Sequence, residues 1–164
     1  MGNNRFVGFL QTAWQRLANL TAGKKDPASR VLLTRQEQSI SACATLESGF
    51  GNVEDWGVWS TAKTSVISLV LPKWPRKLTL NFRVQAFGKV KAVDIQYESR
   101  KIGHWTILQC APTYYLLDCS KLPRGKRIRI AFQNDEMSRP CDLVKGSTDG
   151  RTLGIGLCSL RVMD

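Results

Sequence analysis

Hydrophobic and polar residues alternate along most of the chain after about residue 30. Residues 78–84 place apolar side chains at every second position, and residues 127–133 do the same. This period of two is typical of a β-strand with one buried and one solvated face. The same criterion, together with proline and glycine turn signals, predicts further strands at 31–35, 40–46, 64–71, 90–97, 103–109, 113–119 and 153–162.

Eight or nine short strands without intervening helical periods predict an all-β fold, a jelly-roll-like antiparallel β-sandwich. In two of these segments, 90–97 and 153–162, the apolar positions change parity along the strand. A β-bulge is the natural explanation of such a change, so we expect one in each segment.

The N-terminal region has a different period. Between Arg5 and Leu20 the apolar residues recur at spacings of three and four, which predicts one amphipathic helix. Gly23 can end this helix, and the residues up to Pro27 form a linker. We therefore expect a helix and linker over 1–27 and a β-sandwich over 28–164. The helix could dock on the domain, bind a protein partner or lie on an anionic membrane surface.

The net charge of the chain limits the classes of possible binding partner but does not select one of them. The 164 residues carry a formal net charge of +11, which attracts anions such as nucleic acids, acidic glycans or lipid headgroups. No stretch approaches the roughly 18 apolar residues of a membrane-spanning helix. No secretory signal is recognisable at the N-terminus, so we expect a cytoplasmic location, with peripheral attachment to the inner membrane as an alternative.

The sequence gives little support for a metal site or for a catalytic nucleophile. The five cysteines form no CxxC pair and are odd in number, which favours reduced and mostly buried thiols. The single histidine, His104, lies in a predicted strand, and no GxSxG motif is present. We expect a structural or surface histidine, no metal site and no cofactor.

One segment has an unusual composition. Residues 49–60 contain Trp56, Trp59, Glu54 and Asp55 among several glycines. Tryptophan faces contact the CH faces of sugar rings, and carboxylates accept hydrogen bonds from vicinal hydroxyls, so this mixture suits a saccharide site. The alternative is that both tryptophans belong to the core. A long polar connection at 138–151 leads into the last predicted strand, and such loops often carry binding groups.

Several motifs resemble a bacterial β-sandwich module that is appended to cell-surface polysaccharide glycosyltransferases and phosphoglycerol-transferase-like proteins. The matching segments are residues 54–60, 102–107, 139–143 and 149–160, of which the last, D-x-R-x-L-G-I-G-L-x-S-L, is the most specific. The resemblance implies a role in envelope polysaccharide biosynthesis. It also implies that the shared surface or frame of the module includes Glu54, Trp56, Trp59, Asp149 and Arg151.

We therefore expect a noncatalytic saccharide-binding or glycosyltransferase-accessory module, whose ligand-binding residues are Glu54, Trp56, Trp59, Asp149 and Arg151. Its partners would be a glycan or a glycosyltransferase. The alternative is an adaptor recruited to a protein or a membrane surface by the N-terminal helix. A third hypothesis is a glycan-cleaving enzyme that uses Glu54 with Asp142 or Asp149. Nucleic acid ranks below glycan because no RNA- or DNA-binding motif is present.

Overall fold

The computed structural model describes residues 32–89, 91–108 and 111–164. The helix predicted at 5–20 and the domain boundary predicted at 27–28 lie outside these residues. Among the residues described, no helix is both long enough and apolar enough to cross a lipid bilayer.

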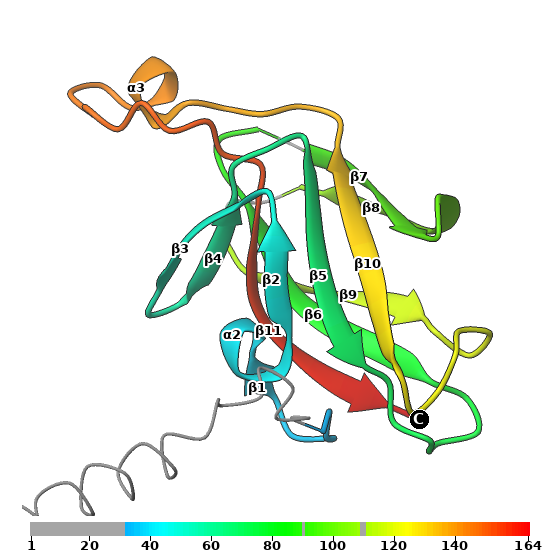
Figure 1. The fold of residues 1–164 in the computed structure, drawn as a ribbon. Coiled ribbons are helices and arrows are strands. Elements are labelled where there is room, and N and C mark those ends of the chain that lie inside the picture. Colours follow the sequence, from blue (N-terminus) through cyan, green and yellow to red (C-terminus); the bar gives the residue numbers. More distant parts are fainter. Residues whose placement is uncertain (1–31, 90, 109–110) are drawn as a thin grey trace, which may run out of the picture. The chain divides into compact units, whose positions relative to one another are not determined.

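Two antiparallel sheets make up the fold (Figure 1). Sheet A has the strand order β3-β4-β11-β6-β9, with β1 also paired to β11, and sheet B has the order β2-β5-β10-β7-β8. The elements are β1 (Gln38–Ser39), α2 (Ile40–Cys43), β2 (Thr45–Ser48), β3 (Phe50–Glu54), β4 (Gly57–Ser60), β5 (Thr64–Val70), β6 (Thr79–Ala86), β7 (Lys91–Tyr97), β8 (Arg100–Ile107), β9 (Thr113–Asp118), β10 (Arg127–Asn134), α3 (Pro140–Leu143) and β11 (Ile155–Met163). The predicted antiparallel sandwich is confirmed.

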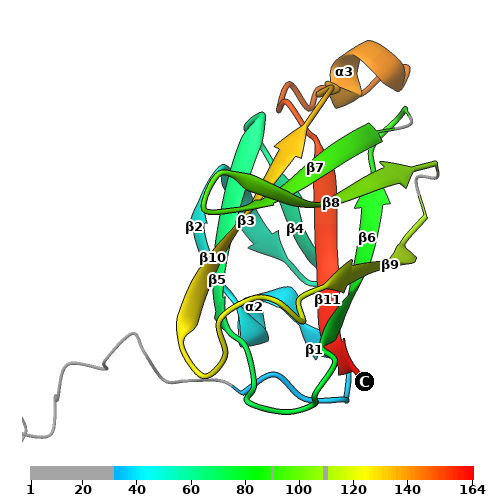
Figure 2. The same ribbon diagram turned by 90° about the vertical axis from the view of Figure 1, so that its right-hand side faces the viewer.

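The core lies between the inward faces of the two sheets. Phe82 from sheet A packs against Trp105 and Phe132 from sheet B, with ring centroids 5.4 Å and 5.8 Å away. These three side chains are at most 5% exposed. The alternating apolar positions of β6 and β10 supply much of this layer, because every second side chain of a strand points to the same face. Figure 2 shows β6 beside β11 in sheet A.

One predicted strand is wrong and another is right only at its end. No strand covers the described part of 31–35, and the segment 40–46 begins with the helical turn α2 before β2 starts. Ile40 and Cys43 are both buried, and their spacing of three residues places them on one side of a helical turn. A short apolar run does not distinguish a buried helical turn from a strand, which explains the error.

The predicted bulge in β11 is confirmed, since its pairing with β6 shifts register between Leu157 and Ser159. The bulge predicted from the parity change in β7 is misplaced. Lys91, Val93 and Ile95 all face inward, and the register shift follows Ile95. The apolar pattern was misleading because a lysine occupies an inward position. Its ammonium donates a 2.6 Å hydrogen bond to Ser138, and loss of hydration lowers the pKa of Lys91.

The four cysteines in the described residues are free thiols. Cys43, Cys119 and Cys158 are buried, and Cys141 is partly exposed. Burial raises the pKa of Cys43 and of Cys119 to about 12. Both therefore stay protonated near neutral pH and have little nucleophilic thiolate.

In the native protein at about pH 8, we predict that iodoacetamide alkylates Cys43 and Cys119 about a hundredfold more slowly than Cys141. The reason is that the thiolate is the reactive form. Peptide mass spectrometry after timed alkylation measures each rate. The three rates should converge in denaturant. Similar rates in the native protein would contradict the burial of these thiols.

Candidate functional site

The segment at 49–60 is a β-hairpin, which was not among the strands predicted from the sequence. Strands β3 and β4 pair from Phe50 to Ser60, and Asp55 and Trp56 form the turn between Glu54 and Gly57. Gly57 has φ +149°, and a Cβ built there would lie 2.2 Å from the carbonyl oxygen of Leu157. Only glycine allows the hairpin to approach β11 this closely.

Both tryptophans of the hairpin lie on the outer face of sheet A. Val58 faces the core, so Trp59 points the other way, and Trp59 pairs with Gly156 of β11. A Cβ at Gly156 would lie only 2.8 Å from Cη2 of Trp56, so the Trp56 ring rests against the backbone of β11. The alternative that both tryptophans belong to the core is therefore wrong, since both are partly exposed.

An aromatic cluster extends from this position. The Trp56 and Trp59 ring centroids are 4.9 Å apart with planes inclined at 62°, and Phe87 meets Trp59 edge-on at 6.0 Å. Aromatic pairs prefer such edge contacts. The cluster forms one apolar ridge along the outer face of sheet A.

A polar network fixes the orientation of Trp56. The indole Nε1 donates to Glu54 Oε2 at 2.7 Å, and Arg151 Nη1 donates to Glu54 Oε1 at 3.1 Å. Arg151 also donates through Nε and Nη2 to Asp149, the shortest of these bonds being 2.8 Å. The structure thus brings the five residues singled out from the sequence, Glu54, Trp56, Trp59, Asp149 and Arg151, into one connected cluster.

Asp149 and Arg151 keep their charges near neutral pH. Hydrogen bonds from the Arg151 side chain and backbone lower the pKa of Asp149, and those to Asp149 and Glu54 raise the pKa of Arg151. A glycosidic general acid needs a raised pKa, so the state of Asp149 is opposite to that role. The other acid considered for catalysis, Asp142, instead lies beside Cys141 and Arg139.

An open pocket of about 490 Å³ lies beside Trp56 on the same face. Arg83 and Gln85, from the outward positions of β6, line it together with Asp55. Its remaining lining residues are Glu37, Gln38, Ser39, Pro112, Cys158 and Ser159. Sequence reasoning missed Arg83 and Gln85. The alternation in residues 78–84 predicted that both side chains point outward from the sheet. Their position beside Trp56 could not be predicted, because it depends on pairing between strands far apart in the sequence.

Glu37 forms an ionised wall of this pocket. It accepts hydrogen bonds from the hydroxyls of Ser159 and Tyr114, the latter at 2.8 Å. These two bonds are the main reason why the pKa of Glu37 is lowered, and Arg83 and Arg161 add to the effect. Both carboxylate oxygens of Glu37 therefore already accept a hydrogen bond. By contrast, the side chains of Arg83 and Gln85 have no hydrogen-bond partner among the described residues.

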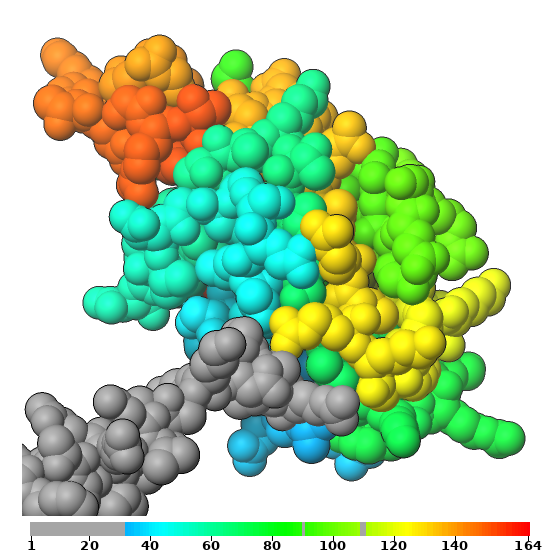
Figure 3. Space-filling model, viewed as in Figure 1, coloured from blue at the N-terminus to red at the C-terminus, as the bar shows by residue number. Residues whose placement is uncertain are grey.

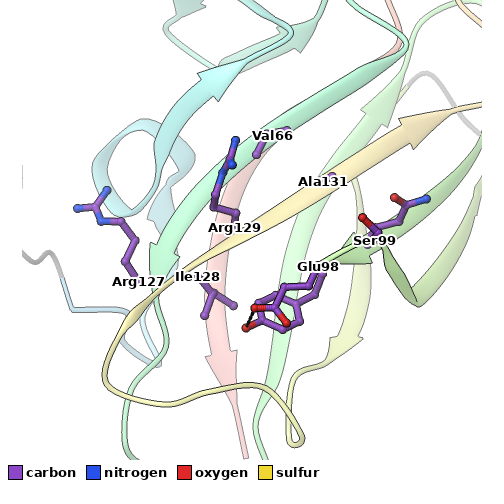
Figure 4. Close-up of a pocket in the computed structure, with 9 residues that line it drawn as sticks. Val66, Glu98, Ser99, Arg127, Ile128, Arg129 and Ala131 are labelled. Carbon is purple, nitrogen blue, oxygen red and sulfur yellow. Dashed lines mark hydrogen bonds between the residues drawn. The ribbon is translucent and has the colours of Figure 1, made fainter.

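Sheet B carries a second pocket of about 430 Å³, beside Arg129 and the β7–β8 turn (Figure 4). Its aromatic residue, Tyr97, donates its hydroxyl to Glu98 at 2.9 Å, and Arg129 donates to Glu47. Glu98 and Ser99 have φ values of 48° and 63°, as a tight hairpin turn requires. Without a tryptophan in its lining, this pocket is a weaker candidate.

His104 lies on the outer face of sheet B. Its Nδ1 is 2.6 Å from Asp94 Oδ1, and Lys101 pairs with the same carboxylate. The interpretation of His104 as a surface histidine is confirmed, since its side chain is exposed and hydrogen-bonds to Asp94.

We predict that Gly156→Ala displaces Trp56, because the added methyl group would overlap the indole ring. The expected result is an altered near-ultraviolet circular dichroism spectrum and a loss of about 1 kcal/mol in the free energy of unfolding. Gly150→Ala is the control, since its Cβ would meet only an Arg139 nitrogen at 3.7 Å. An unchanged Trp56 environment in Gly156→Ala would contradict the described contact.

Comparisons with known proteins identify the fold. A family model described as "Domain of unknown function (DUF7024)" matches residues 30–164. No curated protein matches the chain.

Among solved structures, the CBM36-1 domain of a multidomain xylanase from the hindgut metagenome of Trinervitermes trinervoides is similar with a TM-score of 0.52 and 12% identity, over 79% of this chain and 96% of that one. The carbohydrate-binding module CBM36 in complex with calcium and xylotriose is similar with a TM-score of 0.51 and 11% identity, over 78% and 99% of the two chains. The likeness is one of fold, a two-sheet β-sandwich.

Proposed function

The chain belongs to the family described as a domain of unknown function (DUF7024), and from its structure we propose that it is a noncatalytic saccharide-binding module. The observation that carries this proposal is Trp56, a partly exposed indole beside an open pocket with polar walls. The ring can pack against the CH face of a sugar. Arg83, Gln85 and Asp55 can then exchange hydrogen bonds with the sugar hydroxyls.

The platform is ordered before any ligand arrives. Gly156 supports the Trp56 ring from beneath, and Glu54 holds its N–H. Arg151 in turn links Glu54 to Asp149 on the loop that precedes β11. A side chain held in its binding orientation loses little conformational entropy on binding, which favours affinity. In this proposal Glu54, Asp149 and Arg151 act chiefly by positioning Trp56.

Similarity of fold supports the same class of function. The two solved structures compared above, both with TM-scores above 0.5, are carbohydrate-binding modules by their descriptions. Proteins that share a fold can differ in function, so the proposal depends on the Trp56 site. The similarity of fold is additional support.

We also propose that the module assists a glycosyltransferase in envelope polysaccharide biosynthesis. The support is the sequence resemblance, above all the run from Asp149 to Leu160. The structure gives this run physical meaning, since Asp149 pairs with Arg151, Gly156 accommodates Trp56 and Ser159 bonds to Glu37. The resemblance thus coincides with the residues that build the candidate site.

We predict that Trp56→Ala lowers the affinity for the best-bound oligosaccharide at least about tenfold, or about 1.4 kcal/mol, because the stacking surface is lost. A glycan array identifies that oligosaccharide, and calorimetry measures the affinity of each variant. Trp74→Ala is the matched control, because Trp74 is an exposed tryptophan outside the site. Equal losses in both variants would argue against the Trp56 site.

We predict that Gln85→Ala weakens the same interaction roughly threefold to tenfold, by removing a hydrogen-bonding wall of the pocket. Gln96→Ala serves as its control, since Gln96 lines the pocket of sheet B. The measurement is the same titration with the same oligosaccharide. Weaker binding in Gln96→Ala and not in Gln85→Ala would move the site to sheet B.

A further inference from the structure

Positive charge is concentrated at one end of the sandwich. The loops at 71–78 and 119–126, here named the basic loops, contain six of the 24 lysine and arginine residues and none of the 13 acidic residues. The first loop follows β5 and the second precedes β10, and these two strands pair in antiparallel fashion. Figures 1 and 2 show both loops at the end of the sandwich where the C-terminus lies.

The basic loops are tied into one surface. The backbone N–H of Gly125 donates to the Leu71 carbonyl at 2.8 Å. The guanidinium of Arg124 donates to the carbonyls of Pro72 and Pro75, the latter at 3.1 Å. Arg124 therefore has a structural role, and it orders the loop that bears the neighbouring lysines. In Figure 3 the two loops, coloured green and yellow, lie side by side.

The other five basic side chains of these loops, Lys73, Arg76, Lys77, Lys121 and Lys126, are all exposed. Among the described residues, none of the five takes part in an ion pair within 4.0 Å. By contrast, the nearby Arg129 pairs with Glu47. The basic loops therefore present five cations outside ion pairs, beside the Arg35–Asp164 pair that flanks Trp74, and such a cluster attracts an external anion.

The composition of this end favours a lipid surface over a nucleic acid. Four of the five cations are lysines, which act as point charges and lack the planar fork that arginine uses for bidentate contacts with phosphate and bases. Trp74 is the one aromatic residue of the basic loops, and it is exposed. The Arg35 guanidinium lies 5.1 Å from its ring centroid. A series of stacking platforms would be expected for single-stranded nucleic acid.

We propose that the basic loops form a docking surface for an anionic lipid membrane. Lysines placed at the headgroup level gain electrostatic energy from anionic lipids, and tryptophan is favoured at the membrane–water interface. The surface lies at the end of the strands, whereas Trp56 lies on the outer face of sheet A. Docking through the loops leaves the Trp56 face accessible, so this proposal does not depend on saccharide binding.

The test compares two triple variants of the full chain. In the first, Lys73, Lys77 and Lys126 of the basic loops become Gln. In the second, Lys63, Lys89 and Lys145, which are exposed residues in the loops at the opposite end, become Gln. Each variant loses three charges, so the net charge falls from +11 to +8 in both. Any contribution of residues 1–30 is the same in both variants.

Co-sedimentation measures partitioning onto phosphatidylcholine vesicles with and without about 30% phosphatidylserine, near physiological ionic strength. We expect the unaltered chain and the second variant to bind the anionic vesicles and the first variant to bind at least about tenfold more weakly. Binding should also fall steeply at about 1 M salt.

Three results would overturn the proposal. Equal weakening of both variants would show that net charge matters and that the basic loops do not. Unchanged binding of the first variant would place any membrane contact elsewhere. Tighter binding of an oligonucleotide or of polygalacturonate than of the anionic vesicles, lost in the first variant, would assign the surface to a soluble polyanion.

Discussion

Close packing of the β3–β4 hairpin against β11 determines where the functional side chains lie. Gly57 meets the Leu157 carbonyl at a distance that no Cβ would permit, and Gly156 leaves room for an indole ring directly on the strand. The contact coincides with the register shift of β11 after Leu157. Because the hairpin lies this close to β11, the position of Trp56 is restricted. The candidate pocket lies beside its ring.

Behind the hairpin, the core supplies the rigidity that such a site requires. Phe82, Trp105 and Phe132 pack between the sheets, and the strands that carry them also carry outward side chains. Gln85, for example, follows the inward Val84 of β6 and reaches the pocket. Alternation along a strand thus links the burial of one face to the placement of polar groups on the other.

The sequence was most informative where burial is periodic. Residues 78–84 and 127–133 were predicted correctly because sandwich strands bury alternate side chains. The five candidate residues were singled out because tryptophans and acids are concentrated in one short segment and because of the resemblance, and they remain a prediction as a binding site. Lys91 and α2 were missed, since a buried lysine and a single helical turn break the simple pattern. Arg83 and Gln85 were missed because only the folded sheet brings them beside Trp56.

The seat of Trp56 on the backbone of β11 has a stereochemical consequence. The indole lies against Gly156, and the Trp59 ring centroid is 4.9 Å from its own, so a ligand can reach only the part of the ring that these neighbours leave exposed. In the proposed function, a pyranose stacked on that part of the ring presents a continuous CH face to it. Sugars whose hydroxyls are all equatorial have such faces, whereas an axial hydroxyl on the contacting face would be pressed against the indole and lose its hydration. The proposed saccharide site is therefore expected to discriminate among sugar stereoisomers.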